Sequence, residues 1–386
     1  MQFKEPEHIV MLRSTLRQFI DKEMPRDKVN QWDQDDYFPK DVFKKLVDLG
    51  VTTLTVPEEY GGNGRDMLAT IATIEELATR SIGIASGFIF CACYAGLNIV
   101  ESGSEQQKAE LLPKVAAGEM LFSYGISEPD VGGDVASVRT TAKLENDMVV
   151  VNGSKRWCSG PLITDYIYTV VRTGPEEERY KNLSIILIPP TSAGITIEPQ
   201  KTLGQKGVGG TCDVTFDDVK IPKENIFGGE EGWNDGWSKI IGSGLEVEKI
   251  EVAALALGIA RAAVEDAWQY SQERIQFGKP ICHNQSVRHM LSEVKTNLEA
   301  CKLMTYQGAW LADQGEGSAQ MSMAKLFVTE TALDIVLTCQ KILGAYGYVR
   351  DFDMERYVRD MLAMPIIGGS SAIQKNNIAN RLKLPR

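Results

Sequence analysis

Residues 148–188 read MVVVNGSKRWCSGPLITDYIYTVVRTGPEEERYKNLSIILI. This segment and the one that follows it contain short runs of β-branched and aromatic residues, at residues 148–151, 166–171, 183–188, 195–197 and 212–216. Gly, Pro, Asn and Asp residues separate the runs from one another. Several short strands at this spacing predict a compact antiparallel β-domain.

Helical patterns lie on both sides of this β-rich segment. On its N-terminal side, apolar residues recur at helical spacing at Ile9, Leu12, Leu16, Phe19 and Ile20, and then through residues 41–49 and 68–77. On its C-terminal side, three long stretches lack proline, at residues 246–272, 286–311 and 321–343. The order of helices, strands and helices predicts an α+β fold rather than alternating βαβ units. We expect a helical domain at 1–120, a β-domain at 121–230 and a helical domain at 231–386.

Composition limits the kinds of partner that this chain can have. Its 386 residues are 43% hydrophobic and 24% charged, which is enough to bury a large core. The net charge of −11 disfavours binding to a nucleic acid backbone. It leaves room for a phosphorylated cofactor, because a local basic pocket is enough to hold one. Three histidines, scattered cysteines and the lack of an HExxH motif predict no metal site.

The N-terminal residues MQFKEPEHIVMLRSTLRQFI carry acidic residues early and interrupt each apolar run with charges. They fit neither a signal peptide nor an acid-poor transit peptide. No stretch approaches the ~20 consecutive apolar residues of a membrane span. The seven cysteines are expected to be reduced thiols. The sequence therefore predicts a cytoplasmic protein without membrane insertion, or a matrix protein whose transit peptide has been removed.

Several common cofactor and nucleophile motifs are missing. No GxGxxG follows a predicted strand, and neither GxxxxGK nor GxSxG occurs. If the chain binds a nucleotide cofactor, another kind of scaffold must hold it.

Segments spread over the whole chain resemble the acyl-CoA dehydrogenase family. They are VPEEYGG at 56–62, YGISEPDVGGD at 124–134, VNGSKRWCS at 151–159, RIQFGKP at 274–280, LGAYGY at 343–348, MERYVRD at 354–360 and IGGSSAIQ at 367–374. Each motif is weak alone, but their order and spacing together are specific. The resemblance implies a helical N-terminal domain, a middle antiparallel β-domain and a C-terminal four-helix bundle. It also implies non-covalently bound FAD and a homotetramer, and it is closest to the crotonobetainyl-CoA reductase branch.

The resemblance also implies which residues bind the flavin. Tyr124 and Ser127 are expected beside the isoalloxazine ring, Trp157 is expected to stack near it, and Ser159 is expected to hydrogen-bond at N5. Arg274 resembles the arginine that pairs with the FAD pyrophosphate across a subunit contact, a role that suits a guanidinium group. The same motifs add four residues to the cofactor site: Phe277, Gln285, Gly344 and Ser370. Judged alone, Trp157 fits a core aromatic equally well, and Arg274 fits a surface arginine at a helix end.

The catalytic base is the point at which the sequence departs from most of the family. Dehydrogenation needs a base for the α proton, and a carboxylate suits this if burial raises its pKa. Most of the family has this glutamate where Gly368 stands. A minority has it on the long helix that opens the C-terminal bundle, and there Glu248 takes its position. Gly368 would still offer a backbone N–H to the thioester oxygen.

Alternatives to Glu248 remain open at this stage. Glu251 lies one helical turn further on and is the second candidate base. Without the family, Glu246, Glu248 and Glu251 fit a solvated acidic helix face. The resemblance places Gly133, Glu246 and Lys249 near substrate, where Gly133 replaces a common serine and Lys249 a common arginine. Acyl specificity is expected from pocket residues near Tyr94 and Gly96.

The expected function is α,β-dehydrogenation of an acyl-CoA thioester, or the reverse enoyl-CoA reduction. Glu248 would be the base, flavin N5 the hydride acceptor, and an electron-transfer flavoprotein the electron partner. One alternative is a redox-neutral desulfinase-like enzyme. The desulfinases also carry glycine in the last motif, but they lack a glutamate where Glu248 stands. A second alternative is a non-catalytic acyl-CoA-binding protein. Bleaching of a bound flavin by an acyl-CoA would separate the first function from both alternatives.

Overall fold

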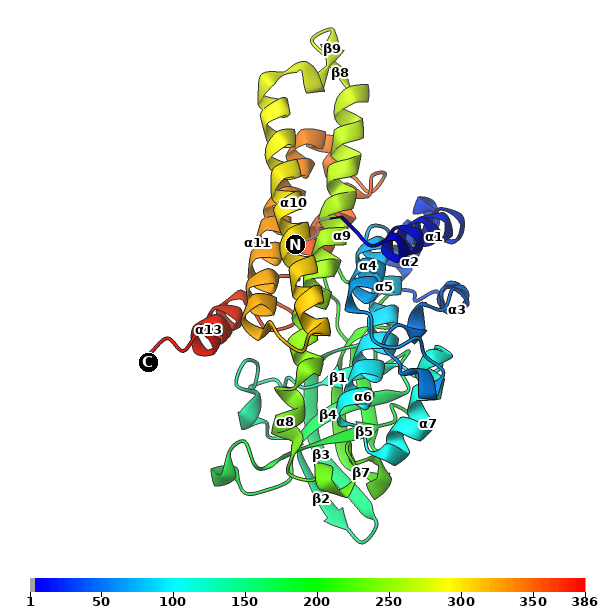
Figure 1. The fold of residues 1–386 in the computed structure, drawn as a ribbon, viewed down its shortest axis with the longest axis vertical. Helices are drawn as coiled ribbons and strands as arrows, with labels where there is room; N and C mark the ends of the chain where they lie inside the picture. Colours follow the sequence, from blue (N-terminus) through cyan, green and yellow to red (C-terminus); the bar gives the residue numbers. More distant parts are fainter. Residues whose placement is uncertain (1–3, 386) are drawn as a thin grey trace.

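The computed structural model describes residues 4–385, with side chains described for all of them except 243–245. Figure 1 shows a β-sheet at one end of the longest axis and three long helices running toward the other end. The N-terminal helices lie beside both parts. The fold is therefore a helical N-terminal domain, a middle β-domain and a C-terminal helical domain, as the sequence predicts.

The N-terminal domain is built from helices packed around one apolar core. They are α1 (Glu7–Glu23), α2 (Arg26–Asp35), α3 (Lys40–Val47), α4 (Met67–Ala78), α5 (Ile82–Phe88), the π-helix η3 (Ile89–Leu97), α6 (Asn98–Ser102) and α7 (Glu105–Ala116). Polar side chains cap several of their N-termini. Asp66 accepts a hydrogen bond from Ala69 N at 2.8 Å before α4, and Ser104 and Gln107 form a capping box at α7.

The continuous helical run Ile82–Ser102 corrects one prediction from the sequence. Its 21 residues contain a window with a mean hydropathy of 1.7, so by length and composition it is apolar enough to cross a membrane. The prediction that no stretch approaches such a span was wrong. However, 94% of that window is buried inside the protein, so packing against the neighbouring elements accounts for its apolar character.

The middle domain is a seven-stranded sheet with the order β1-β4-β2-β3-β7-β6, in which β5 pairs with β4. Its strands are β1 (Phe122–Gly125), β2 (Thr141–Glu145), β3 (Met148–Ser159), β4 (Tyr166–Arg172), β5 (Leu183–Ile188), β6 (Ile195–Pro199) and β7 (Thr211–Pro222). Most ladders are antiparallel, as predicted, but β1 runs parallel to β4 and places Tyr124 opposite Tyr168. A parallel pair needs a long crossover, and the β2–β3 hairpin lies within that connection.

The C-terminal domain contains three long helices packed lengthwise and several shorter ones. They are α8 (Gly236–Ile240), α9 (Ser243–Glu273), α10 (Gln285–Asp313), α11 (Ser318–Leu343), α12 (Met354–Met361) and α13 (Ser371–Arg381). The short α12 packs against α9 and α11, and α13 packs against α11. A hairpin of β8 (Ile275–Gln276) and β9 (Lys279–Pro280) joins α9 to α10 at the end far from the large sheet (Figure 1).

Buried ion pairs join the N-terminal helices to the bundle. Glu75 and Glu76 of α4 are both buried, and each accepts hydrogen bonds from Arg13 of α1 and from Arg261 of α9. Arg261 lies 2.6 Å from a carboxylate oxygen of each glutamate. Tyr306 of α10 donates to Glu75 at 2.6 Å. The network connects four helices that lie far apart in the sequence.

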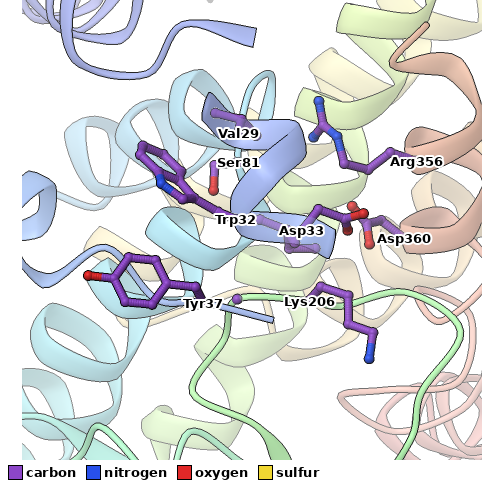
Figure 2. A pocket seen from close by; sticks show the side chains of 10 residues that line it. Val29, Trp32, Asp33, Tyr37, Ser81, Lys206, Arg356 and Asp360 are labelled. Carbon is purple, nitrogen blue, oxygen red and sulfur yellow. The ribbon is translucent and has the colours of Figure 1, made fainter. Parts of the chain in front are cut away.

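A small pocket lies where α2, α5, the loop before β7 and α12 meet. Figure 2 shows Asp33 of α2 and Asp360 of α12 pointing toward one another there, with Lys206 of the loop beside them. Burial raises the pKa of Asp360 to about 6, and its carboxylate accepts a hydrogen bond from Gln205 N at 2.7 Å. Gly207 N donates to Asp36 at 2.8 Å, so the β-domain loop is fastened to both helical domains.

Candidate functional site

The π-helix η3 brings the N-terminal domain into contact with strand β1. π-Helical turns within longer helices often mark functional sites. Here the Tyr94 ring stacks on the Tyr124 ring, with 3.8 Å between centroids and 10° between planes. The Asn98 amide donates to the Tyr124 hydroxyl at 2.7 Å and to the Tyr94 carbonyl at 2.8 Å. The two tyrosines are therefore held as one stacked pair.

This tyrosine pair is connected to Glu248 on α9. The Tyr94 hydroxyl donates to Glu248 Oε1 at 2.9 Å. Burial raises the pKa of Glu248, while the Tyr94 hydrogen bond and the charges of Lys325 and Lys249 act in the opposite direction. The side chain remains partly accessible. Glu248 is thus a carboxylate with a raised pKa at the junction of all three domains, which is the character of a general base.

Gly368 lies directly opposite this carboxyl group. A Cβ atom placed on Gly368 would lie 3.9 Å from Glu248 Cδ and 2.9 Å from Val252 Cγ2. The backbone φ of 60° also favours glycine at this position. Within residues 4–385 the Gly368 N–H makes no hydrogen bond, while its carbonyl accepts one from Gln374 Nε2 at 3.0 Å. The Gly368 N–H is therefore available as a hydrogen-bond donor near the Glu248 carboxyl group.

Glu251 lies one turn further along α9 in a drier setting. It is only 2% exposed, and the Cys93 thiol of η3 donates a hydrogen bond to it. Its Oε2 has no hydrogen-bond partner among the described residues. Burial and then the charge of Glu248 raise the pKa of Glu251 well above its ordinary value. The helix face carrying these glutamates is therefore not a solvated acidic surface.

A bulge in β3 places Trp157 beside the end of β1. The pairing of β3 with β7 shifts register between Lys155 and Cys158, and Trp157 has a φ of 63° and is 55% exposed. Arg156 N donates to the Ser127 carbonyl at 2.8 Å. A large aromatic residue held exposed in a left-handed conformation indicates a ligand-binding surface.

Two further contacts fix the edge of this surface. The Ser123 hydroxyl donates to the Ser159 carbonyl at 2.8 Å, which ties β1 to the end of β3. The buried Lys155 Nζ lies 2.8 Å from Glu128 Oε1 and donates to the Ile126 carbonyl at 3.2 Å. The structure therefore brings together four of the predicted cofactor residues: Tyr124, Ser127, Trp157 and Ser159.

Other predicted cofactor residues lie elsewhere in this chain. Arg274, Phe277 and Gln285 surround the β8–β9 hairpin, at the opposite end of the bundle from the large sheet (Figure 1). Phe277 is 96% exposed, and the Arg274 guanidinium lies 5.3 Å from the centre of the Tyr346 ring. Within one chain, these residues do not meet the Trp157 surface.

Gly344 and Ser370 occupy helix ends. Gly344 has a φ of 60° after α11, and a Cβ atom there would meet nothing within 4 Å. Ser370 caps α13 and accepts from Ile373 N at 3.5 Å. A Cβ atom on Gly133 would lie 2.8 Å from Ile373 Cδ1, so the loop after β1 lies against α13.

Glu246 and Lys249 form a polar cluster at the start of α9. Lys249 Nζ lies 2.8 Å from Glu246 Oε2, and the Ser318 hydroxyl donates to the same oxygen at 2.7 Å. Arg381 of α13 lies 2.8 Å from the other oxygen. In this structure the Glu246 carboxylate therefore ties α9 to α11 and α13, and its expected contact with substrate stays a prediction.

Not every residue of the site could be predicted from the sequence. Tyr94 was expected only as a neighbour of the acyl chain, not as a hydrogen-bond donor to the base. Asn98 and Lys325 were not singled out. Lys325 is fully buried on α11, and its Nζ has no hydrogen-bond partner among the described residues. The available signal was a lone lysine in the otherwise apolar stretch MSMAKLFV at 321–328.

Comparisons with known proteins cover nearly the whole chain. Residues 6–119, 123–219 and 234–383 match the profiles for "Acyl-CoA dehydrogenase, N-terminal domain", "middle domain" and "C-terminal domain". An "Acyl-CoA dehydrogenase" of Bacillus subtilis is 34% identical over 378 residues, covering 97% of each chain. The "Caffeyl-CoA reductase-Etf complex subunit CarC" of Acetobacterium woodii is 29% identical, covering 96% of this chain and 97% of its own. The solved structure of butyryl-CoA dehydrogenase from Megasphaera elsdenii has a TM-score of 0.93 at 28% identity, covering 99% of this chain and 100% of its own.

Proposed function

This chain belongs to the acyl-CoA dehydrogenase family, and from that premise we propose that Glu248 is the base that exchanges the α proton of an acyl-CoA thioester. Like the other members of this family, it is a flavoprotein oxidoreductase that uses FAD and acts in acyl-CoA dehydrogenation or reduction.

One observation carries the proposal: the Glu248 carboxyl faces the bare backbone of Gly368. The carboxyl group occupies the side of the site that a residue at 368 would otherwise reach. Its raised pKa makes it a stronger base than an exposed glutamate. The free Gly368 N–H can donate to the thioester oxygen, where charge develops when the α proton leaves. Base and donor therefore converge on one small region.

The surface around Trp157 fits the isoalloxazine ring. When bound, FAD accepts or returns the β hydride at N5. Trp157 offers an exposed aromatic face, with Ser127 in the loop after β1 and Ser159 at the end of β3. Tyr124 lies on β1, three residues before Ser127, and is linked through Tyr94 to Glu248. Direct contacts thus connect Tyr124, one of the residues proposed for the cofactor, to the proposed base.

Assembly and electron transfer are parts of the same proposal. Arg274, Phe277 and Gln285 are remote from Trp157 within one chain, so we propose that they meet the FAD of another copy in a homotetramer. The name of the CarC relative supports an electron-transfer flavoprotein as the partner, and it shows that relatives catalyse reduction. Glu248 together with Gly368 supports the crotonobetainyl-CoA reductase-like branch.

Replacing Tyr94 with phenylalanine should move the pH dependence of the reaction. The Tyr94 hydrogen bond lowers the pKa of Glu248, so its loss raises that pKa. Because the base acts in its ionised form, the rate of flavin reduction should rise at a higher pH than in the wild type. We expect a shift of about one pH unit. An unmoved profile would show that this hydrogen bond does not act on the base.

Trp157→Ala should weaken FAD binding by about five-fold without unfolding the protein, since loss of aromatic stacking costs on the order of 1 kcal/mol. The side chain is exposed, so its removal leaves no core cavity. Fluorescence titration of the apoprotein with FAD measures the affinity, and Trp157→Phe is the matched control that keeps an aromatic face. Unchanged affinity in Trp157→Ala would place the flavin elsewhere.

The function itself is tested with a panel of acyl-CoA and enoyl-CoA thioesters. We expect at least one saturated thioester to bleach the oxidised flavin under anaerobic conditions, or one enoyl-CoA to reoxidise the reduced flavin. A coloured protein that turns over a thioester without any flavin change would indicate a redox-neutral, desulfinase-like enzyme. A colourless protein that does not take up FAD would indicate a non-catalytic binding protein.

A further inference from the structure

Two buried polar groups beside the proposed base are not used by the mechanism above. They are Glu251, whose Oε2 has no hydrogen-bond partner, and Lys325, whose Nζ has none among the described residues. Leaving a charge or a polar atom unpaired in a protein interior is costly, so such groups point to a function. The charge of Lys325 lowers the pKa of Glu248, and the charge of Glu248 raises the pKa of Glu251.

The two carboxyl groups of α9 have different surroundings. Glu248 accepts a strong hydrogen bond from the Tyr94 hydroxyl at 2.9 Å and feels the charge of Lys325, which lies on the helix packed along α9. Glu251 has the Cys93 thiol as its neighbour, and a thiol is a weak donor. The contacts that stabilise a negative charge therefore converge on Glu248 and not on Glu251.

We propose that Lys325 is a positioning residue that separates the two carboxyl groups of α9 into one base, Glu248, and one neutral neighbour, Glu251. The Lys325 ammonium group keeps Glu248 ionised, and Glu251 carries a proton. This inference rests on the proposed role of Glu248. It also assigns the base to Glu248 rather than to Glu251, since an already protonated acid cannot accept the α proton.

The charged groups around the two glutamates agree with an ionised Glu248 and a protonated Glu251. Several other titratable groups face the set: Cys93 and Tyr94 from η3, Tyr124 from β1, Lys249 from α9 and Glu330 from α11. The Ser371 hydroxyl donates to Glu330, and the Glu246 carboxylate is bonded to Lys249. Two neighbouring carboxylates in a dry site do not both ionise readily, and a single ammonium group compensates one of them. Burial lowers the pKa of Lys325 to about 8, so its charge is present at neutral pH.

Infrared difference spectroscopy of the FAD-loaded protein tests which of the two glutamates carries the proton, and it needs no thioester. At neutral pH, Glu251→Gln should remove one protonated-carboxyl band, and Glu248→Gln should remove an ionised-carboxylate band. The opposite assignment of the two bands would overturn the proposal. Each substitution keeps size and polarity, so the two variants serve as controls for one another.

Lys325 is tested by the titration of Glu248 in the same spectra. In Lys325→Met the midpoint at which Glu248 ionises should rise by about one pH unit or more, because an opposite charge has been removed. Lys325→Arg retains the charge and should restore the wild-type midpoint. A midpoint that stays at its wild-type value in Lys325→Met would overturn the role of Lys325. If that variant does not retain FAD, Lys325→Gln supplies the same comparison.

Flavin reduction separates this inference from the function on which it rests. If Glu248→Gln reduces its flavin at the wild-type rate, the proposed base is wrong whatever the infrared bands show. If Glu248→Gln is inactive but the bands are assigned in the opposite way, only the division between the two carboxyl groups fails. We also expect Glu251→Gln to keep the wild-type pH profile, since it replaces one neutral group with another. A profile shifted to lower pH would show that Glu251 is ionised and would overturn the proposal.

Discussion

Glu248→Gln should lower the rate of flavin reduction by a thioester at least ~100-fold, the scale expected when a general base is lost. The amide cannot take the α proton, but its oxygen can still accept the hydrogen bond from Tyr94. Among the described residues the Glu248 carboxylate forms no ion pair, and its one hydrogen bond is from Tyr94, so the fold should survive. Anaerobic stopped-flow absorbance, with the thioester that bleaches the wild-type flavin most strongly, gives the rate.

The matched control for this variant is Glu251→Gln, one helical turn away. It makes the same chemical change in the same helix, and we expect its rate to stay within about three-fold of the wild type, below the scale of a lost general base. FAD content should equal that of the wild type in both variants, because neither glutamate belongs to the Trp157 surface. A Glu248→Gln enzyme with near wild-type rate would remove Glu248 from the mechanism. A large loss in Glu251→Gln alone would transfer the role to Glu251.

The pH dependence of the wild-type rate follows from the same residue. Burial raises the pKa of Glu248 above its ordinary value, and the base works when ionised. The rate of flavin reduction should therefore rise with pH through a midpoint above the ordinary range of a glutamate. The Tyr94 and Lys325 substitutions are both expected to move this midpoint further upward, because each removes a stabilising influence on the carboxylate.

Periodicity in the sequence located most of the regular structure. The runs at 183–188 and 166–171 correspond to β5 and β4, and the long proline-free stretches correspond to α9, α10 and α11. These elements repeat one simple pattern over many residues, so local sequence is enough to define them. The run at 148–151 captured only the start of β3, because Gly153 and the bulge at Trp157 interrupt the pattern.

Features that depend on tertiary contacts were not visible in the sequence. Strand β1 has the sequence FSYG, which is too short and mixed to indicate a strand, and it exists through its parallel pairing with β4. The π-helical geometry of η3 likewise has no local signature, yet it sets the position of Tyr94. The buried charge of Lys325 becomes meaningful only when α11 is packed against α9.

In the candidate site, too, some features could be predicted from the sequence and others depend on tertiary contacts. The position of Glu248 could be proposed because Gly368 breaks a motif that the rest of the chain follows. The hydrogen bond from Tyr94 could not be proposed, since it joins residues 154 positions apart. Residue types at motif positions carry information about chemistry, whereas the contacts that tune a pKa arise from packing between domains.

Arg261→Leu should produce the largest loss of stability among these variants, about 3–5 kcal/mol of unfolding free energy. Arg261 lies 2.6 Å from both Glu75 and Glu76, which are buried, and leucine leaves their charges only partly compensated. Breaking a buried ion pair by removing one partner typically costs this much. Chemical denaturation of the FAD-loaded protein, followed by circular dichroism, measures the change.

Arg17→Leu is the control, because Arg17 also contacts Glu76, at 3.1 Å, but its side chain is 60% exposed. A solvent-screened pair of this kind contributes at most about 1 kcal/mol. Burial alone would raise the pKa of Glu76, but the arginines, Arg261 foremost, hold it at about 2. A depressed carboxyl pKa stabilises the fold above the unfolded value and loses that effect as pH falls toward the folded value. The loss of unfolding free energy in Arg261→Leu should therefore become smaller as the pH falls from about 4.5 toward 2. A loss that does not change with pH would show that it comes from lost packing and not from lost charge.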